Sequence, residues 1–422
     1  MKSLIKNAQL FYDHKLSNVD VLIEDGKFTK IANDIPAGDI DVIDANNELV
    51  APGLVDVHVH FREPGQVHKE TIKTGTLASA HGGFTTVGAM PNVTPVPDDA
   101  DKFKKQLALN KENSLIKTLQ YAPVTKDETS DELVDIEGLA KLGAFAFSND
   151  GHGIMNAQSM FTAMERIAAI DSHLAAHVED KNLFNKGVIN FGSASRRLGL
   201  PGIQQVAETS QLARDLVLAK ETGVHYHVCH ISTKDGVELV RMAKDAGINV
   251  TCEASPHHLL LSDKDILTDD ANFKMNPPLR SEEDRLALIA GLQDGTIDMI
   301  ATDHAPHAVE EKNQGFKKSA FGITGIETSF PLMYSRLVKT GLISLEKLLD
   351  LMAYNPAKIF NLNAGEIKVG QAADFTILNL DNEYEIKTED FLSKGKNSPF
   401  VGQNVFGLVE QTYVDGEKVY SK

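Results

Sequence analysis

The chain has 422 residues, of which 42% are hydrophobic and 24% charged, a composition typical of a folded globular protein and unlike that of a disordered chain. This length fits one large α/β barrel with a satellite domain, or two to three ordinary domains. The formal net charge of −17, together with the lack of any long basic run, argues against nucleic acid and anionic membranes as partners.

Cysteine content and the N-terminal sequence bear on where the protein works. Two cysteines, Cys229 and Cys252, cannot build a disulfide framework, which favours the reducing cytosol. Residues 1–6 lack the apolar core of a signal peptide, and no apolar stretch approaches the roughly 18 residues that a membrane helix needs. We therefore expect a cytoplasmic protein.

In chain order, short strands are predicted first at one end of the chain and again at the other. Strand-like segments lie at residues 4–10, 19–23, 27–31, 373–378 and 409–414. Asp-Gly pairs at 25–26 and 415–416 are typical hairpin turns. We expect a composite β domain made of residues 1–51 and 364–422, flanking a barrel domain over residues 52–363.

The middle of the chain alternates apolar strand-like segments with amphipathic helical ones. The expected strands are residues 54–61, 85–90, 117–122, 143–148, 173–178, 225–230, 249–252 and 296–302. The clearest expected helices are residues 159–170, 202–221 and 281–292. Eight alternations favour parallel βαβ units closed into a (β/α)8 barrel of the TIM type.

A His-x-His pair ends the first expected barrel strand. Side chains at i and i+2 share one face of a strand, so His58 and His60 point the same way. The carboxyl ends of barrel strands surround the active-site mouth, where two imidazoles suit a divalent metal. Alone, such a pair is more often structural than metal-binding.

Four further residues of metal-ligand type end other strands of the same barrel: Asp150, His177, His230 and Asp303. Each has an ordinary alternative role, since an Asp after a strand commonly caps a helix and a His there is often structural. Six such residues at the ends of five strands are hard to obtain by chance. Four His and two carboxylates can hold two metals if one carboxylate bridges.

Several motifs now resemble one family. They are residues 52–65 (PGLVDVHVHFREPG), 90–92 (MPN), 274–280 (KMNPPLR), 302–307 (TDHAPH) and 321–322 (FG) near 325–327 (GIE). The chain resembles the type I bacterial dihydroorotases of the metal-dependent amidohydrolase superfamily, and the resemblance runs nearly end to end. It implies a hydrolase acting on cyclic amides, with two zinc ions and no organic cofactor.

The resemblance also implies roles for individual residues. A first zinc would be held by His58, His60 and Asp303, a second by His177 and His230, and Asp150 would bridge them. Many relatives bridge with a carbamylated Lys on the fourth strand, but no Lys lies in residues 143–150.

One residue departs from the type I pattern. Asn149 stands where the pattern has Asp. We expect Asn149 to face away from the bridge and to have little effect on it.

The implied reaction is the reversible cyclisation of N-carbamoyl-L-aspartate to L-dihydroorotate in pyrimidine biosynthesis. Zinc would activate the attacking water and polarise the ring carbonyl, and Asp303 would carry the proton to the leaving nitrogen. Arg62 follows His60 by two and is expected on the same inward face, where a guanidinium can bind the substrate carboxylate. The other implied substrate contacts are His60, Phe61, Asn92, Asn276, His307, Phe321 and Gly322.

Alternatives stay open at this point. Hydantoinases, dihydropyrimidinases and allantoinases share the barrel and metals, but their substrates lack the carboxylate that Arg62 would bind. A non-catalytic scaffold for aspartate transcarbamoylase is disfavoured because all six ligands are present. A homodimer and a contact between this enzyme and aspartate transcarbamoylase are further partner expectations. Residues 304–321 are either an ordinary surface loop or a lid over the substrate.

Overall fold

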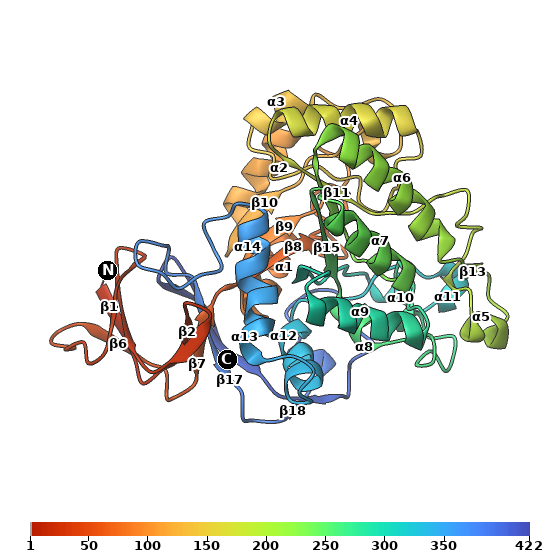
Figure 1. The fold of residues 1–422 in the computed structure, drawn as a ribbon. Coiled ribbons are helices and arrows are strands. Elements are labelled where there is room, and N and C mark those ends of the chain that lie inside the picture. Colours follow the sequence, from red (N-terminus) through yellow and green to blue (C-terminus); the bar gives the residue numbers. More distant parts are fainter. Residues whose placement is uncertain (1) are drawn as a thin grey trace.

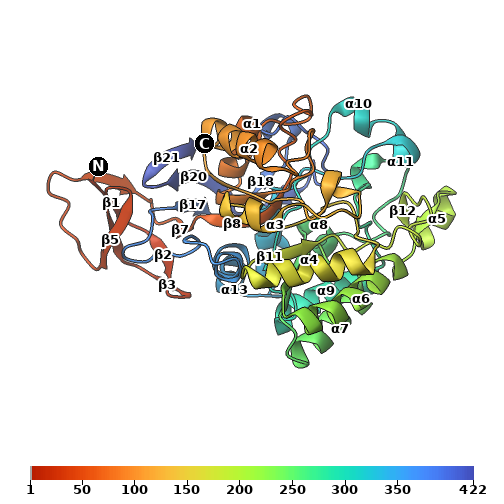
Figure 2. The same cartoon turned by 90° about the horizontal axis from the view of Figure 1, so that it is seen from above.

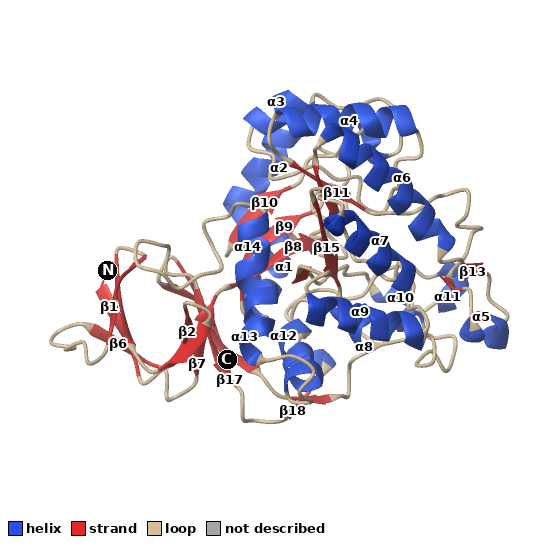
Figure 3. Ribbon diagram, viewed as in Figure 1, coloured by secondary structure: helices blue, strands red, loops and turns tan. Residues whose placement is uncertain are grey.

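The computed structural model describes residues 2–422, and it places a β-rich part at one side of a barrel surrounded by helices (Figure 1). Seen from above, the strands of both chain ends again gather at the same side (Figure 2). No helix in the described part of the chain combines the length and apolar character needed to span a membrane. Colouring by secondary structure separates the two parts clearly (Figure 3).

Two sheets form the β-rich part. The first has the order β5-β4-β1-β6, with β1 Lys2–Lys6, β4 Asp20–Glu24, β5 Lys27–Ala32 and β6 Asp41–Asp44. The second has the order β21-β20-β17-β7-β2-β3, with β2 Gln9–Tyr12, β3 Lys15–Ser17, β7 Leu49–Pro52, β17 Phe375–Asn379, β20 Leu408–Val414 and β21 Glu417–Ser421. Because β17 pairs with β7, the two ends of the chain share one sheet. The domain bounds given above stay a prediction.

Parallel strands form the barrel wall. They are β8 Leu54–Val59, β9 Phe84–Ala89, β10 Lys117–Gln120, β11 His173–Ala176, β14 His225–Val228, β15 Val250–Ala254 and β16 Met299–Ile300. The ladders join β8 to β9 to β10, and β11 to β14 to β15 to β16.

Single bridges close the ring where regular strands are missing. Phe147 bridges in parallel to Ala122 on one side and to Leu174 on the other, so it fills the fourth barrel position. The expected strand at residues 143–148 is thus reduced to this one bridge. Val59 bridges to His304, which joins the eighth position to the first.

Helices cover the outside of the barrel. They are α1 Ile72–His81, α2 Ala100–Asn113, α3 Ile136–Lys141, α4 Ala157–Ala169, α6 Val206–Thr222, α7 Lys234–Asp245, α9 Glu282–Asp294, α12 Ser329–Met333, α13 Leu345–Leu349 and α14 Asn355–Ile359. Two π-helical segments, η3 Tyr334–Val338 and η4 Asp350–Tyr354, continue α12 and α13. The three expected helices are confirmed as α4, α6 and α9, and α9 begins with a capping box between Ser281 and Asp284.

Shorter elements decorate the loops. They are α5 Ser193–Leu198, α8 Pro256–Leu260, α10 Val309–Lys312, α11 Gly315–Lys318, η1 Lys126–Glu128, η2 Ala271–Phe273, η5 Thr388–Asp390, β12 Ile189–Asn190, β13 Gly202–Ile203, β18 Tyr384–Glu385 and β19 Asn404–Val405. Inside the barrel, Val55, Tyr121 and Phe360 belong to one buried apolar cluster. This packed interior leaves the strand ends as the place for chemistry.

Candidate metal centre and substrate pocket

The six predicted ligand residues come together at the carboxyl ends of the barrel strands. His58 lies in β8, and the others directly follow strands or the Phe147 bridge: His60, Asp150, His177, His230 and Asp303. All six side chains are buried, with residue exposures between 0% for His58 and 6% for Asp303. Residues up to 245 positions apart in sequence therefore share one water-poor centre.

Two groups of three residues have ligand atoms close enough to share an ion. In the first, Asp303 Oδ1 lies 3.0 Å from His60 Nε2 and 3.5 Å from His58 Nε2. In the second, which also includes Asp150, His177 Nδ1 lies 3.1 Å from His230 Nε2.

Asp150 lies between these two groups. Its Oδ1 is 3.3 Å from His58 Nε2 and 3.6 Å from His230 Nε2, and its Oδ2 is 3.5 Å from His60 Nε2. One carboxylate therefore contacts histidines of both groups, which is the placement that a bridging ligand requires.

Buried polar atoms without a hydrogen-bond partner indicate whether a cation fits the centre. His58 Nε2 and Asp150 Oδ1 are buried and have no hydrogen-bond partner in the described structure, although they face each other. Such atoms are costly to bury unless something binds them. Imidazole nitrogen and carboxylate oxygen are ordinary ligands of Zn²⁺ and similar divalent ions. The donor set therefore fits metal ions.

The charges of the centre also suit a cation. Burial alone would raise the pKa of Asp150, but the neighbouring His58 and His230 hold it well below its usual value. For Asp303, burial is likewise outweighed by His60 and His58, and its pKa is lowered. Both carboxylates are thus ionised at neutral pH, and each offers negative charge to a bound metal.

A third cluster of ligand type includes Cys229 with His58 and Asp150. Burial raises the pKa of Cys229 to about 12, so its sulfur stays a thiol at neutral pH. A thiol is a poor ligand compared with a thiolate. Cys252 is buried as well.

A small cavity of about 180 Å³ opens onto the centre. Its lining comprises His60, Arg62, Asn92, Asp150, Gly151, His177, His230, Asn276, Asp303, Ala305, Phe321 and Gly322. Of the predicted substrate contacts, His307 lies next to this lining, because its Nε2 donates to the Phe321 carbonyl at 2.7 Å. The Phe61 side chain packs against Gly75 in α1 and is not part of the lining.

Arg62 reaches the cavity by a route that differs from the expected one. The strand stops at Val59, and Arg62 adopts a positive φ of 60° instead of continuing the strand. Its Nε donates to the Pro306 carbonyl at 3.3 Å, and its Nη2 lies 3.4 Å from His307 Nε2. His230 and Asp303 also have positive φ, a conformation uncommon outside glycine and found at functional sites.

The two asparagines contact the ligand residues directly. Asn92 Oδ1 is 2.9 Å from His60 Nδ1, and Asn92 Nδ2 donates to Asp150 Oδ2 at 3.2 Å. Asn276 Nδ2 donates to Glu179 Oε2 at 2.7 Å and lies 3.4 Å from His177 Nε2. Both asparagines thus orient ligands besides lining the cavity.

Asn149 faces away from the centre, as expected. Its Oδ1 accepts from the Val124 and Thr125 amides, and its Nδ2 donates to Thr125 Oγ1 at 2.7 Å and to the Glu128 carbonyl at 3.2 Å. The side chain therefore holds the loop before η1 in place.

Residues 304–321 contain the helices α10 and α11, and two lysine side chains hold the backbone of this segment. Lys312 is buried, and its Nζ donates to the carbonyls of Lys274, Ala320 and Gly322 at 2.8–3.0 Å. Lys274 Nζ in turn donates to the Phe316 and Ser319 carbonyls at 2.5 Å. Movement of this segment as a lid stays a prediction.

Sequence reasoning missed Glu253, a buried carboxylate that contacts the ligand residue His58. Its Oε1 lies 2.6 Å from His58 Nδ1, and its Oε2 lies 3.1 Å from His227 Nε2. Burial alone would raise the pKa of Glu253, but the two histidines lower it to about 2. The available signal was a charged residue in the buried strand β15, because a buried carboxylate needs a partner inside the barrel.

Comparisons with known proteins agree with this geometry. Residues 47–236 match a family model described as Dihydro-orotase-like, and residues 292–420 match one described as Amidohydrolase family. Dihydroorotases of Lactobacillus helveticus and Ligilactobacillus salivarius are each 55% identical over 100% of this chain and 99% of their own.

Solved structures give the same fold. The L-hydantoinase (dihydropyrimidinase) of Arthrobacter aurescens superimposes with a TM-score of 0.89 at 29% identity, covering 100% of this chain and 96% of its own. A dihydropyrimidinase of Brevibacillus agri NCHU1002 superimposes with a TM-score of 0.88 at 23% identity, covering 100% and 95%. Because dihydroorotases match it at 55% identity over the full length of both chains, the chain belongs to the dihydroorotase family of amidohydrolases.

Proposed function

We propose that this protein is a dihydroorotase that interconverts N-carbamoyl-L-aspartate and L-dihydroorotate. The observation that carries the proposal is the composition of the 180 Å³ cavity, whose lining combines five of the six ligand-type residues with the guanidinium of Arg62. A small ring with an amide and a carboxylate matches this combination. The full-length relatives with 55% identity support the same reaction.

Two zinc ions are the cofactor proposed for this centre. His58, His60 and Asp303 would hold one, His177 and His230 the other, and Asp150 would bridge them. When bound, such ions supply an activated water and polarise a carbonyl oxygen. The orphaned His58 Nε2 and Asp150 Oδ1 support this assignment.

Asp303 is the proposed proton carrier. In the hydrolytic direction, water adds its oxygen to the ring carbonyl carbon, and the Asp303 carboxylate accepts the proton. The ring C–N bond then breaks, and the same proton passes to the leaving nitrogen. Ring closure follows these steps in reverse, with release of water.

Arg62 is proposed to bind the substrate carboxylate, with His307 beside it holding the Phe321 backbone. A guanidinium has five N–H donors, the Pro306 carbonyl accepts from one of them, and two others can bind a carboxylate. Burial first, then the charge of Arg62, lower the pKa of His307 to about 2, so its ring is neutral. The proposed cation of this subsite is therefore Arg62 alone, with Asn92, Asn276 and the Phe321-Gly322 backbone completing the contacts.

A substrate panel tests the proposal. Purified protein is assayed with dihydroorotate, dihydrouracil and hydantoin, and with carbamoyl-aspartate in the reverse direction. We expect dihydroorotate to exceed the two rings without a carboxylate in kcat/KM by at least about a hundredfold, the scale of lost hydrogen bonds to a charged group. Preference for dihydrouracil or hydantoin would support a hydantoinase-type enzyme, and no turnover of any ring would support a scaffold.

We also propose partners and a location. A cytoplasmic homodimer, with or without contact to aspartate transcarbamoylase, is our expectation. Light scattering of the purified protein, alone and mixed with that enzyme, tests both associations.

A further inference from the structure

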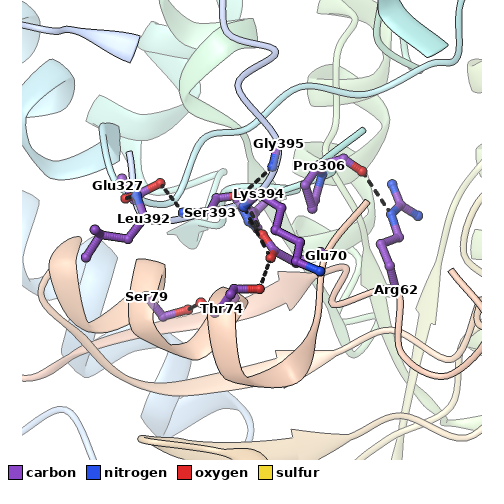
Figure 4. A network of polar contacts seen from close by, with 12 residues as sticks. Arg62, Glu70, Thr74, Ser79, Pro306, Glu327, Leu392, Ser393, Lys394 and Gly395 are labelled. Carbon is purple, nitrogen blue, oxygen red and sulfur yellow. Dashed lines mark hydrogen bonds and ion pairs between the residues drawn. The ribbon is translucent and has the colours of Figure 1, made fainter. Parts of the chain in front are cut away.

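A segment from the C-terminal part of the chain returns to the barrel mouth. We call residues 391–398, which follow η5, the C-terminal strap. Two buried carboxylates hold it (Figure 4): the Leu392 amide donates to Glu327 Oε1 at 2.6 Å, and the Ser393 hydroxyl donates to Glu70. The strap therefore lies in a fixed position against the barrel loops.

Asn397 is the strap residue that contacts the substrate side of the site. It is buried, and its Nδ2 donates to the Ala305 carbonyl at 3.2 Å and to the Gly322 carbonyl at 3.1 Å. Its Oδ1 accepts from the His307 amide at 3.0 Å. One side chain thus ties together two loops that are separate in sequence.

These two loops carry the proposed carboxylate subsite. Arg62 donates to Pro306, between the two residues that Asn397 holds, and His307 donates to Phe321. Space is tight here, because a Cβ on Gly322, whose φ is +119°, would lie 2.6 Å from the Ala305 Cβ. Small shifts of either loop would therefore move the groups that face the cavity.

Asn397 itself is absent from the cavity lining, so it acts through other residues. The Asn397 side chain supplies N–H donors to two carbonyls and an oxygen acceptor to one amide. An Asp of the same shape would place carboxylate oxygens against the two carbonyls. We propose that Asn397 is a positioning residue that sets the width of the carboxylate subsite and so its preference for ring acids. The proposal rests on the proposed function for its substrate.

Two variants and one matched control test this role. Asn397→Ala removes all three contacts, and Asn397→Asp keeps the shape but removes the donor. Lys394→Ala is the control, because Lys394 is exposed and its Nζ donates only to the Val67 carbonyl, away from the subsite. For each protein, KM and kcat for dihydroorotate, metal content and inhibition by orotate and by uracil are measured.

We expect both Asn397 variants to raise the KM for dihydroorotate about tenfold, the scale of one or two lost hydrogen bonds. The kcat should change less than KM, metal content should not change, and the preference of inhibition for orotate over uracil should shrink. The control should match the wild type. Unchanged KM and inhibitor preference in both Asn397 variants would overturn the proposal.

Hydrogen exchange of the backbone separates this inference from the proposed function. We expect faster exchange across residues 305–324 in both Asn397 variants and not in the control, whatever the substrate is. If wild-type protein does not turn over dihydroorotate, the proposed function fails while the exchange result still decides the positioning role. Equal exchange in all four proteins would refute that role even if the enzyme proves to be a dihydroorotase.

Discussion

At the scale of single residues, the contacts of His58 show how a ligand side chain is oriented toward the proposed metal centre. Its Nδ1 lies 2.6 Å from Glu253, which fixes the ring so that Nε2 faces Asp150 at 3.3 Å and Asp303 at 3.5 Å. Glu253 also lies within hydrogen-bond distance of His227, which in turn contacts Thr251 Oγ1. Contacts that run from Thr251 through His227 and Glu253 therefore orient the ligand residue His58.

Replacing Glu253 should weaken metal binding. Partners of this kind typically affect metal affinity by about tenfold to a hundredfold, so we expect that range for Glu253→Ala and a smaller loss for Glu253→Gln. Competition between the metal-free protein and a chelator measures the affinity without relying on turnover. Glu238→Ala, an exposed Glu on α7, is the control. Wild-type affinity in Glu253→Ala would mean that His58 is oriented by packing alone.

Arg62 should affect the substrate and not the metals. We expect Arg62→Ala to lower kcat/KM for dihydroorotate by about a hundredfold, because a charge-assisted contact to the carboxylate is lost. Arg62→Lys should recover part of this loss, since it keeps the charge without the planar fork. Metal content by elemental analysis should equal that of the wild type in both. Normal turnover by Arg62→Ala would show that another group binds the carboxylate.

At the scale of elements, the regular pattern of strands was predictable and the irregular ends were not. Two-residue alternation predicted that His58 and His60 would point the same way; β8 contains His58, and His60 lies directly after its last residue, Val59. The fourth barrel position could not be outlined from its apolar residues, because only Phe147 bridges to its neighbours. The turn at Arg62 was missed for a related reason, since a positive φ in a non-glycine residue has no clear signature in sequence.

The stability of the folded chain should depend on pH through Lys312, which holds the segment of residues 304–321 in place. Burial lowers its pKa from 10.5 to about 7, so between these values the unfolded chain binds a proton that the folded chain does not, and the folded amine donates to two of its three carbonyl neighbours. Stability from this group is therefore present above the unfolded pKa and is lost as pH falls toward 7.

The comparison is made with Lys312→Met, and with Lys317→Met on the exposed side of α11 as the control. We expect the free energy of unfolding by urea, wild type minus Lys312→Met, to grow between pH 7.5 and 9.5, within the window from about 7 to 10.5. The control should show no such growth. A difference that stays constant with pH would show that folded Lys312 keeps its proton.

At the scale of the whole molecule, the two ends of the chain and the barrel are joined through contacts far apart in sequence. Strands from both chain ends were expected in one β domain, but β7, the strand that pairs with β17, was not among them. The role of Asn397 could not be predicted, because an isolated Asn in a polar segment gives no hint that it contacts His307, 90 residues earlier in the chain. Such contacts depend on the closed barrel, which only the assembled fold provides.

The net charge of −17 has little to do with the site, since only Asp150 and Asp303 among the acidic residues lie in the proposed metal centre. The candidate active site comes from the positions of the six ligand residues in the fold, and not from the excess of acidic residues in the chain. The central claim is therefore that these six residues hold two ions on which turnover of dihydroorotate depends.

Titration of the metal-free protein with zinc tests this claim most directly. Dihydroorotate turnover and bound zinc are measured together, in the wild type and in His177→Ala, which removes one ligand of the second group. The account predicts that wild-type activity rises until two zinc ions are bound per chain, and that His177→Ala binds fewer ions and loses most activity. Full activity without added metal, or an unaffected His177→Ala variant, would contradict it.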